Sequence, residues 1–177
     1  MDPTEYANKY VPEGVTDSLV LRGGNPNKPL VVPARLQQIV DIVFRVENGE
    51  SEATVNEALR VTAAESGFNN EAINWNNDHP DEISDTCWFQ INKINEEMVA
   101  SMGYDFATLN QNPEACVRVA YRLFEMSKGF KYDHDYVEQW KQWGLELPDD
   151  LQELVDSGYI SHGWQWWLMS ARRTGVL

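Results

Sequence analysis

The sequence has few basic residues, few cysteines and no long apolar run. Fourteen Lys and Arg stand against 28 Asp and Glu, which gives a formal net charge of −14. A nucleic-acid surface needs clustered Lys and Arg, and an amphipathic anchor on anionic lipid needs a basic face. Both kinds of partner are therefore excluded. No apolar run approaches the roughly 20 residues that a transmembrane helix requires, so we expect no membrane span.

Cysteine and export signals are also scarce. The two cysteines, Cys87 and Cys116, are too few for a disulfide framework. They could pair or stay reduced, and with no sign of secretion we favour the reduced state. The N-terminus has neither the basic start nor the apolar core of a signal peptide. We therefore expect a protein that is made in the cytoplasm and stays there unless another device exports or releases it.

The remaining composition is typical of one folded domain. A length of 177 residues, an apolar fraction of 42% and seven tryptophans suffice for a single core. Residues 1–33 hold five of the eight prolines and predict an extended N-terminal arm, either a loose tail or a segment that binds a partner. We predict a domain over residues 34–144, and a C-terminal helical extension over 145–177 that packs on the domain or at an interface. The GWQWW segment at 163–167 is interpreted as core or interface rather than a sugar platform.

Helical patterns cover most of the predicted domain. They span residues 34–47, then 51–66 with Ser51 as the N-cap, 95–102, and a strong stripe that begins at Asn112-Pro113. The second pattern ends in an acid. Glu65 lies two turns after Ala58 on the apolar side of the helix, and Gly67 is a plausible stop. A carboxyl group there is partly desolvated, which favours its neutral, proton-donating form.

A polar segment with recurring aspartates follows this helix. Asp78, Asp81 and Asp85 precede residues 88–92, whose alternation of apolar and polar residues predicts a short strand. Their spacing does not fit a twelve-residue calcium loop, so we interpret them as solvated loop acids and expect no metal. A helix-borne acid that faces a second acid across a polar loop is an arrangement used to cleave glycosidic bonds.

Two motifs in this region resemble a known superfamily. They are Glu65-Ser66-Gly67-Phe68-Asn69, followed by Ala72 and Asn74, and then Phe89-Gln90-Ile91-Asn92. Together they resemble the lysozyme-like superfamily, in particular the phage and plasmid branch of the soluble lytic transglycosylase domain, and they share a signature with animal c-type lysozymes. The resemblance covers residues 55–144. Two motifs in the right order and spacing are fairly specific, whereas either alone would be weak.

The resemblance implies a mainly α, lysozyme-like α+β fold: a helical core, a small strand and loop lobe, and a cleft between them. It makes Glu65 the catalytic acid, which would protonate the bridging oxygen between N-acetylmuramic acid and N-acetylglucosamine. Asp85, five residues before Gln90, matches the ionised second acid of c-type lysozymes; the alternative is a solvated loop acid. No metal or organic cofactor is implied.

Further site residues follow from the same resemblance. Ser66 would support Glu65 by a hydrogen bond. Gln90 and Asn92 would hydrogen-bond sugar amides or order the strand turn beneath the cleft, and Phe89, beside them in the motif, is a further candidate substrate-binding residue. Tyr121 and Trp140 could stack on sugar rings, although their helical spacing also fits a core. The family usually has Gly where this chain has Cys87, so we expect a side chain where backbone usually approaches the sugar.

The predicted function is therefore cleavage of the β-1,4 bond of peptidoglycan by a bacteriophage lysis enzyme or a virion-associated enzyme, released to the cell wall or carried in the particle. A first alternative is a lytic transglycosylase, which gives 1,6-anhydro products. An alternative of another class is a structural virion protein with an inactive lysozyme-like domain. The expected partners are glycan strands and, through the arm or the C-terminal extension, virion proteins.

Overall fold

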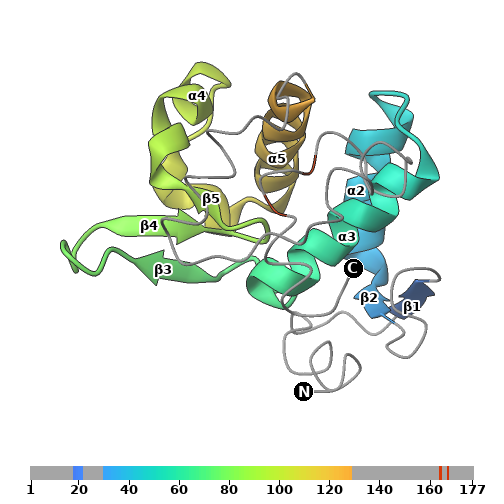
Figure 1. Ribbon diagram of the computed structural model, residues 1–177, viewed down its shortest axis with the longest axis horizontal. Helices are drawn as coiled ribbons and strands as arrows, with labels where there is room; N and C mark the ends of the chain where they lie inside the picture. The colour runs from blue at the N-terminus through green and yellow to red at the C-terminus, as the bar shows by residue number, and fades with distance from the viewer. Residues whose placement is uncertain (1–17, 22–29, 129–163, 165–166, 168–177) are drawn as a thin grey trace, which may run out of the picture.

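The computed structural model describes residues 18–21, 30–128, 164 and 167. Most of the helices and a small three-stranded antiparallel sheet lie side by side (Figure 1). This arrangement confirms the predicted α+β class. Within the described ranges, no helix combines the length and apolarity needed to cross a membrane. Trp140 and the helices expected beyond residue 128 lie outside the described residues.

Helix α3, Glu52–Ser66, begins and ends where the sequence predicts. The Ser51 hydroxyl accepts a hydrogen bond from the Thr54 amide at 3.2 Å, and Gly67 closes the helix in the left-handed conformation at φ 59°. Apart from Asn56, every residue from Thr54 to Ala63 is buried. A helix that is buried on all sides is a core helix, so α3 holds the acid-bearing end in a fixed place.

Helix α3 packs mainly against the two helical elements that precede it in the chain. Helix α2, Ala34–Val40, continues directly into a π-helix, η1, Asp41–Val46, and together they fill the single helix predicted over 34–47. Helix α5, Pro113–Ser127, has Asn112 as its N-cap, and α2 contacts both α3 and α5. Along the chain, three short elements connect the sheet to α5: η2, Lys93–Asn95; α4, Glu96–Ser101; and η3, Phe106–Gln111.

The end of the predicted arm belongs to the core. Strand β1, Ser18–Leu21, pairs antiparallel with β2, Leu30–Pro33. Leu30 and Val32 are two residues apart on β2, so their side chains point to the same face of the strand, and both are buried, at 4% and 0% exposed. The expected separation at residue 33 between the arm and the domain therefore does not describe the packing, because the chain enters the core before that point.

The three-stranded sheet is formed by β3, Ile73–Trp75, β4, Ile83–Thr86, and β5, Ile91–Asn92, in that order. The strand predicted over 88–92 forms only at Ile91 and Asn92, and residues 88–90 belong to a turn. Cys87 and Gln90 have φ angles of 64° and 47°, and these left-handed conformations form a turn instead of a ladder. Trp88 and Phe89 are consequently both buried, whereas neighbouring residues of a strand would face opposite sides.

Two tryptophans from the C-terminal region complete the core. Trp164 is fully buried, with ring centroids 4.7 Å from Phe124, 5.6 Å from Phe44 and 6.4 Å from Phe89. Trp167 is 7% exposed, and its indole N–H donates to the Phe89 carbonyl at 3.0 Å. Trp164 and Trp167 are therefore core residues, which agrees with the core alternative for this segment; residues 163, 165 and 166 lie outside the described residues.

We predict that Trp164→Ala lowers the free energy of unfolding by about 3 to 5 kcal/mol, because it leaves a large cavity among three packed rings. Urea denaturation monitored by circular dichroism measures the change. Trp75→Ala is the matched control, since Trp75 is 54% exposed and its removal should stay within about 0.5 kcal/mol. Equal effects of the two substitutions would contradict this description of the core.

Candidate active site

Glu65 lies in the last turn of α3 and is half-buried. Directly after it, Gly67 and Phe68 both have left-handed backbone, with φ angles of 59° and 64°. Two successive left-handed residues turn the chain sharply out of the helix, and the fully packed Phe68 side chain anchors this turn in the core. The acid is therefore carried on the rigid end of a core helix.

Ser66 joins this helix end to the turn formed by residues 87–90. Its hydroxyl oxygen lies 2.8 Å from the Trp88 carbonyl oxygen and 3.2 Å from the Thr62 carbonyl oxygen. The sequence predicts that Ser66 hydrogen-bonds Glu65, but its described acceptors are these two backbone carbonyls. Ser66 thus fixes the place of the neighbouring acid by tying the helix to the loop, not by holding its carboxyl group.

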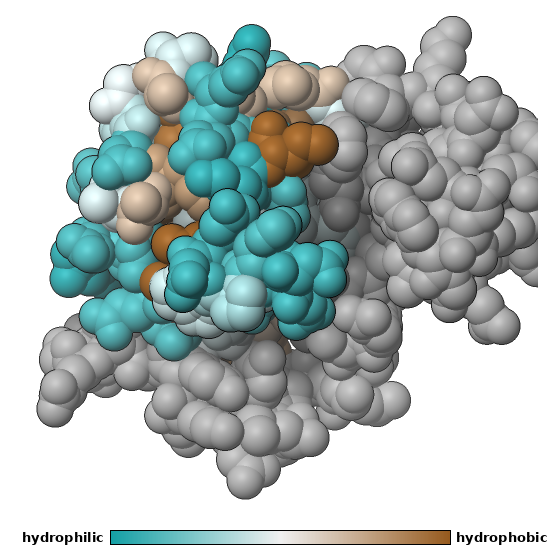
Figure 2. Space-filling view, turned by 90° about the vertical axis from the view of Figure 1, so that its left-hand side faces the viewer, coloured by the Kyte–Doolittle hydropathy of each residue, from teal (hydrophilic) through white to brown (hydrophobic). Residues whose placement is uncertain are grey.

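Asp85 lies at the centre of a polar row across the sheet. Asn74 on β3 and Asn92 on β5 are its partners in register, and directly opposed residues share a face of the sheet. The Asn92 amide donates to one Asp85 carboxylate oxygen at 2.9 Å, and the Ser84 hydroxyl donates to the other at 2.7 Å. The carboxylate is held in one orientation and remains partly exposed. Hydrophilic residues cover most of the described surface on this side of the molecule (Figure 2).

The Gln90 side chain is hydrogen-bonded to the backbone of its own turn and of the neighbouring loop. Its amide nitrogen donates to the Cys87 carbonyl at 2.8 Å and to the Ala72 carbonyl at 3.3 Å, while its amide oxygen accepts from Asn74 at 2.8 Å. These bonds favour the prediction that Gln90 orders the chain beneath the sheet over the prediction that it binds sugar. Asn92, by contrast, is exposed on the row and also caps η2 through the Ile94 amide.

The cysteines are joined, which corrects the expectation that they stay reduced. Cys87 and Cys116 form a disulfide between the turn and α5, and both are fully buried. The Cys87 side chain points into the core, where its sulfur meets that of Cys116. The left-handed φ of 64° at Cys87 explains why Gly suits this position: a residue without Cβ adopts that conformation without strain.

The other predicted binding residues divide between core and surface. Phe89 is fully buried against Trp164 and Trp167, so its ring is a core residue and does not reach a ligand. Tyr121 packs edge-on against Phe44, and its hydroxyl donates to Glu50 at 3.5 Å. Burial, together with Glu125 and Glu50, raises the pKa of the Tyr121 phenol. These contacts place Tyr121 among Phe44, Glu50 and Glu125, none of which belongs to the Asp85 row.

One residue that orders the site was missed in the sequence. Asn70 is buried; its side-chain oxygen accepts from the Trp88 amide at 3.4 Å, and its side-chain nitrogen donates to the Asn110 carbonyl at 2.8 Å. Asn70 thereby joins the loop after α3, the 87–90 turn and the segment before α5. The neighbouring Asn69, a motif residue, only forms a local turn with the Glu71 amide. The sequence signal that could have indicated this role is the pair of asparagines, Asn69 and Asn70, shortly after the helix stop at Gly67.

No group of three His, Cys, Asp or Glu side chains able to hold a metal ion occurs among the residues that the structure describes. Comparisons with protein-family models, with curated proteins and with solved structures found no match for this chain. The candidate site therefore rests on its own chemistry: a half-buried acid on a helix end, and a second acid within a row of amides on an adjoining sheet.

We predict that removing the disulfide with Cys87→Ala and Cys116→Ala lowers the free energy of unfolding by about 3 to 4 kcal/mol. The 29-residue separation sets this value through the chain entropy that the crosslink removes from the unfolded state. Denaturation of the oxidised wild type and the double variant measures the difference. Stability that does not change would show that the sulfurs are not joined in the folded protein.

A second pair of variants separates the crosslink from the backbone strain. With Cys116→Ala in both, Cys87→Gly should be more stable than Cys87→Ala by about 1 kcal/mol, because only glycine adopts φ 64° without a steric cost. If Cys87→Gly is the less stable of the two, the residue does not adopt the left-handed conformation.

Proposed function

We propose that the chain is a glycosidase that cleaves the β-1,4 bond between N-acetylmuramic acid and N-acetylglucosamine in peptidoglycan. The observation that carries the proposal is the attachment of Glu65's helix end to the turn before β5 through Ser66, with Asp85 fixed in the adjoining sheet. A substrate strand would lie between the helix end and the polar face of the sheet.

Glu65 is the proton donor in this proposal. The glycosidic oxygen is a poor leaving group until it is protonated, and a carboxyl group on a rigid, half-buried helix end can supply that proton. The helix end cannot drift from the loop, since Ser66, the disulfide and Asn70 all bind the same turn. The proton can therefore be delivered at one fixed place along the bound strand.

Asp85 stabilises the positive charge that develops on the sugar ring or traps it covalently. Its two hydrogen-bond donors orient the carboxylate, and the amides of Asn74 and Asn92 flank it. Acetamido groups of the two sugars offer matching donors and acceptors for such a row. In the transglycosylase alternative the sugar's own 6-hydroxyl attacks instead, and Asp85 is dispensable.

The decisive experiment is digestion of purified peptidoglycan by wild type and Glu65→Gln, followed by mass spectrometry of the soluble fragments. We expect the substitution to reduce release at least about 100-fold, because it removes the proton donor but keeps the shape. Glu97→Gln, at an exposed position on α4, is the matched control and should digest like wild type. Release by Glu65→Gln at the wild-type rate would refute the assignment.

The products distinguish the two chemistries. Fragments with reducing ends identify a hydrolase, and we then expect Asp85→Asn to lose most activity. Fragments lighter by one water identify a transglycosylase, in which Asp85→Asn stays active. No release by wild type under any condition leaves the structural virion role, in which the domain is retained for assembly without catalysis. The bacteriophage setting, in lysis or in entry, is part of the same proposal.

A further inference from the structure

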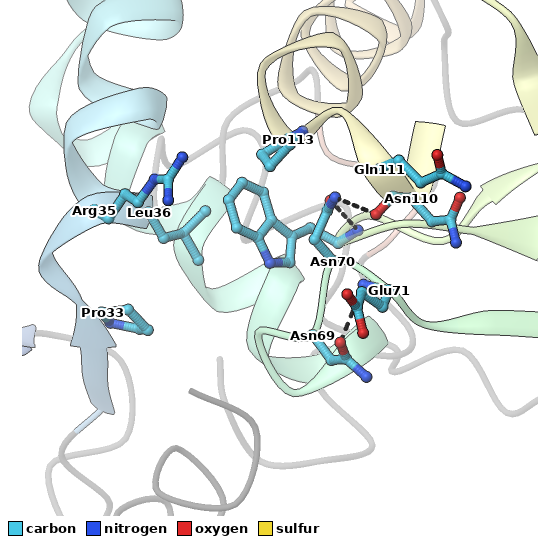
Figure 3. Close-up of a pocket in the computed structure, with 10 residues that line it drawn as sticks. Pro33, Arg35, Leu36, Asn69, Asn70, Glu71, Asn110, Gln111 and Pro113 are labelled. Atoms are coloured by element: carbon cyan, nitrogen blue, oxygen red, sulfur yellow. Dashed lines mark hydrogen bonds between the residues drawn. The ribbon is translucent and has the colours of Figure 1, made fainter. Parts of the chain in front are cut away.

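A pocket of about 390 Å³ opens between the start of α2 and two loops, one after α3 and one before α5 (Figure 3). Its volume lies within the range of sites for small ligands. Neither Glu65 nor Asp85 lines it. Trp88 does, and Trp88 also supplies the carbonyl that accepts the Ser66 hydrogen bond. The pocket and the acid-bearing helix end therefore share one turn of the chain.

The two charged groups of the pocket have opposite signs and come from opposite sides. Arg35, at the start of α2, lies on one side, and Glu71, in the loop after α3, lies on the other (Figure 3). Both residues are exposed, and neither forms an ion pair within the part of the chain that the structure describes. A ligand that carries both a carboxylate and an amine would satisfy both charges at once.

The rest of the lining suits a short peptide. Leu36, Pro113 and Trp88 form apolar walls that can contact small side chains. The Asn69 side-chain oxygen is taken by the Glu71 amide, which leaves the Asn69 side-chain N–H groups to donate to a peptide carbonyl. Sugars alone carry no amine and, apart from the lactyl group, no carboxylate, so the paired charges are better matched by peptide.

We propose that this pocket binds the peptide stem attached to N-acetylmuramic acid, an inference that rests on the proposed function. One substrate then contacts the chain twice: its glycan strand at the Glu65 end of α3, and its peptide in the pocket on the other side of the shared turn. The pocket thereby selects peptide-bearing strands over bare glycan. Arg35 binds a stem carboxylate and Glu71 a stem amine.

The test uses free stem tetrapeptide, released from peptidoglycan by an amidase and carrying no sugar. Isothermal titration with the full chain should show saturable binding, weakened at least about tenfold by Arg35→Ala and by Glu71→Gln, because each removes one charge pair. Arg122→Ala and Glu97→Gln, at exposed positions outside the pocket, are the matched controls and should bind like wild type.

Cleavage assays separate this inference from the proposed function. We expect Arg35→Ala and Glu71→Gln to raise the KM for peptide-bearing peptidoglycan while bare glycan strands are cleaved at the wild-type rate. Glu65-dependent cleavage without any binding of the stem would overturn the pocket assignment alone. Stem binding without Glu65-dependent cleavage would retain the pocket and refute the glycosidase. Equal binding by the pocket variants and wild type would also overturn the assignment.

Discussion

The hydrogen bond from Ser66 to the Trp88 carbonyl joins the two halves of the candidate site, and the position of the acid-bearing helix end relative to the sheet depends on it. Strands β3, β4 and β5 are only three, four and two residues long, and so small a sheet is not stable alone. It acquires its place from the 87–90 turn. That turn is fixed to α3 through Ser66, to α5 through Cys116, and to the loop after α3 through Asn70.

The turn also rests on an aromatic cluster built from distant parts of the chain. Phe89 points down from the turn onto Trp164 and Trp167, and Trp164 in turn packs between Phe44 and Phe124. The position of the Asp85 row therefore depends on the C-terminal region as well as on the neighbouring helices. At the other end of the sequence, β2 contributes Leu30 and Val32 to the core and leads directly into Arg35 and the pocket.

The helices could be predicted from the sequence because their signals are local. Ser51, Gly67 and Asn112 mark helix ends through their own backbone preferences and caps, and the structure places those ends where predicted. The 87–90 turn could not be predicted, because its left-handed residues are Cys and Gln, which carry no turn signal. The alternation of residues 88–92 then reads as a strand.

Contacts between distant residues were equally invisible in the sequence. The lack of a secretion signal favours reduced cysteines, whereas the disulfide follows from the 6.2 Å distance between the Cys87 and Cys116 Cα atoms, which the sequence does not show. Its motif position predicts that Phe89 binds sugar, and only the packing of Trp164 against it shows that it is a core residue. Asn74, Asp85 and Asn92 come side by side only through the pairing register of three strands. The spacing between motifs in the sequence does not determine that register.

If the proposed function is right, glycan binds between the end of α3 and the polar face of the sheet. The most direct measurement is a crystal structure of Glu65→Gln with a tetrasaccharide of alternating N-acetylglucosamine and N-acetylmuramic acid. We predict a glycosidic oxygen within hydrogen-bond reach of the residue 65 side chain, with acetamido groups on Asn74 and Asn92. A tetrasaccharide bound elsewhere on the protein, with this face empty, would contradict the account.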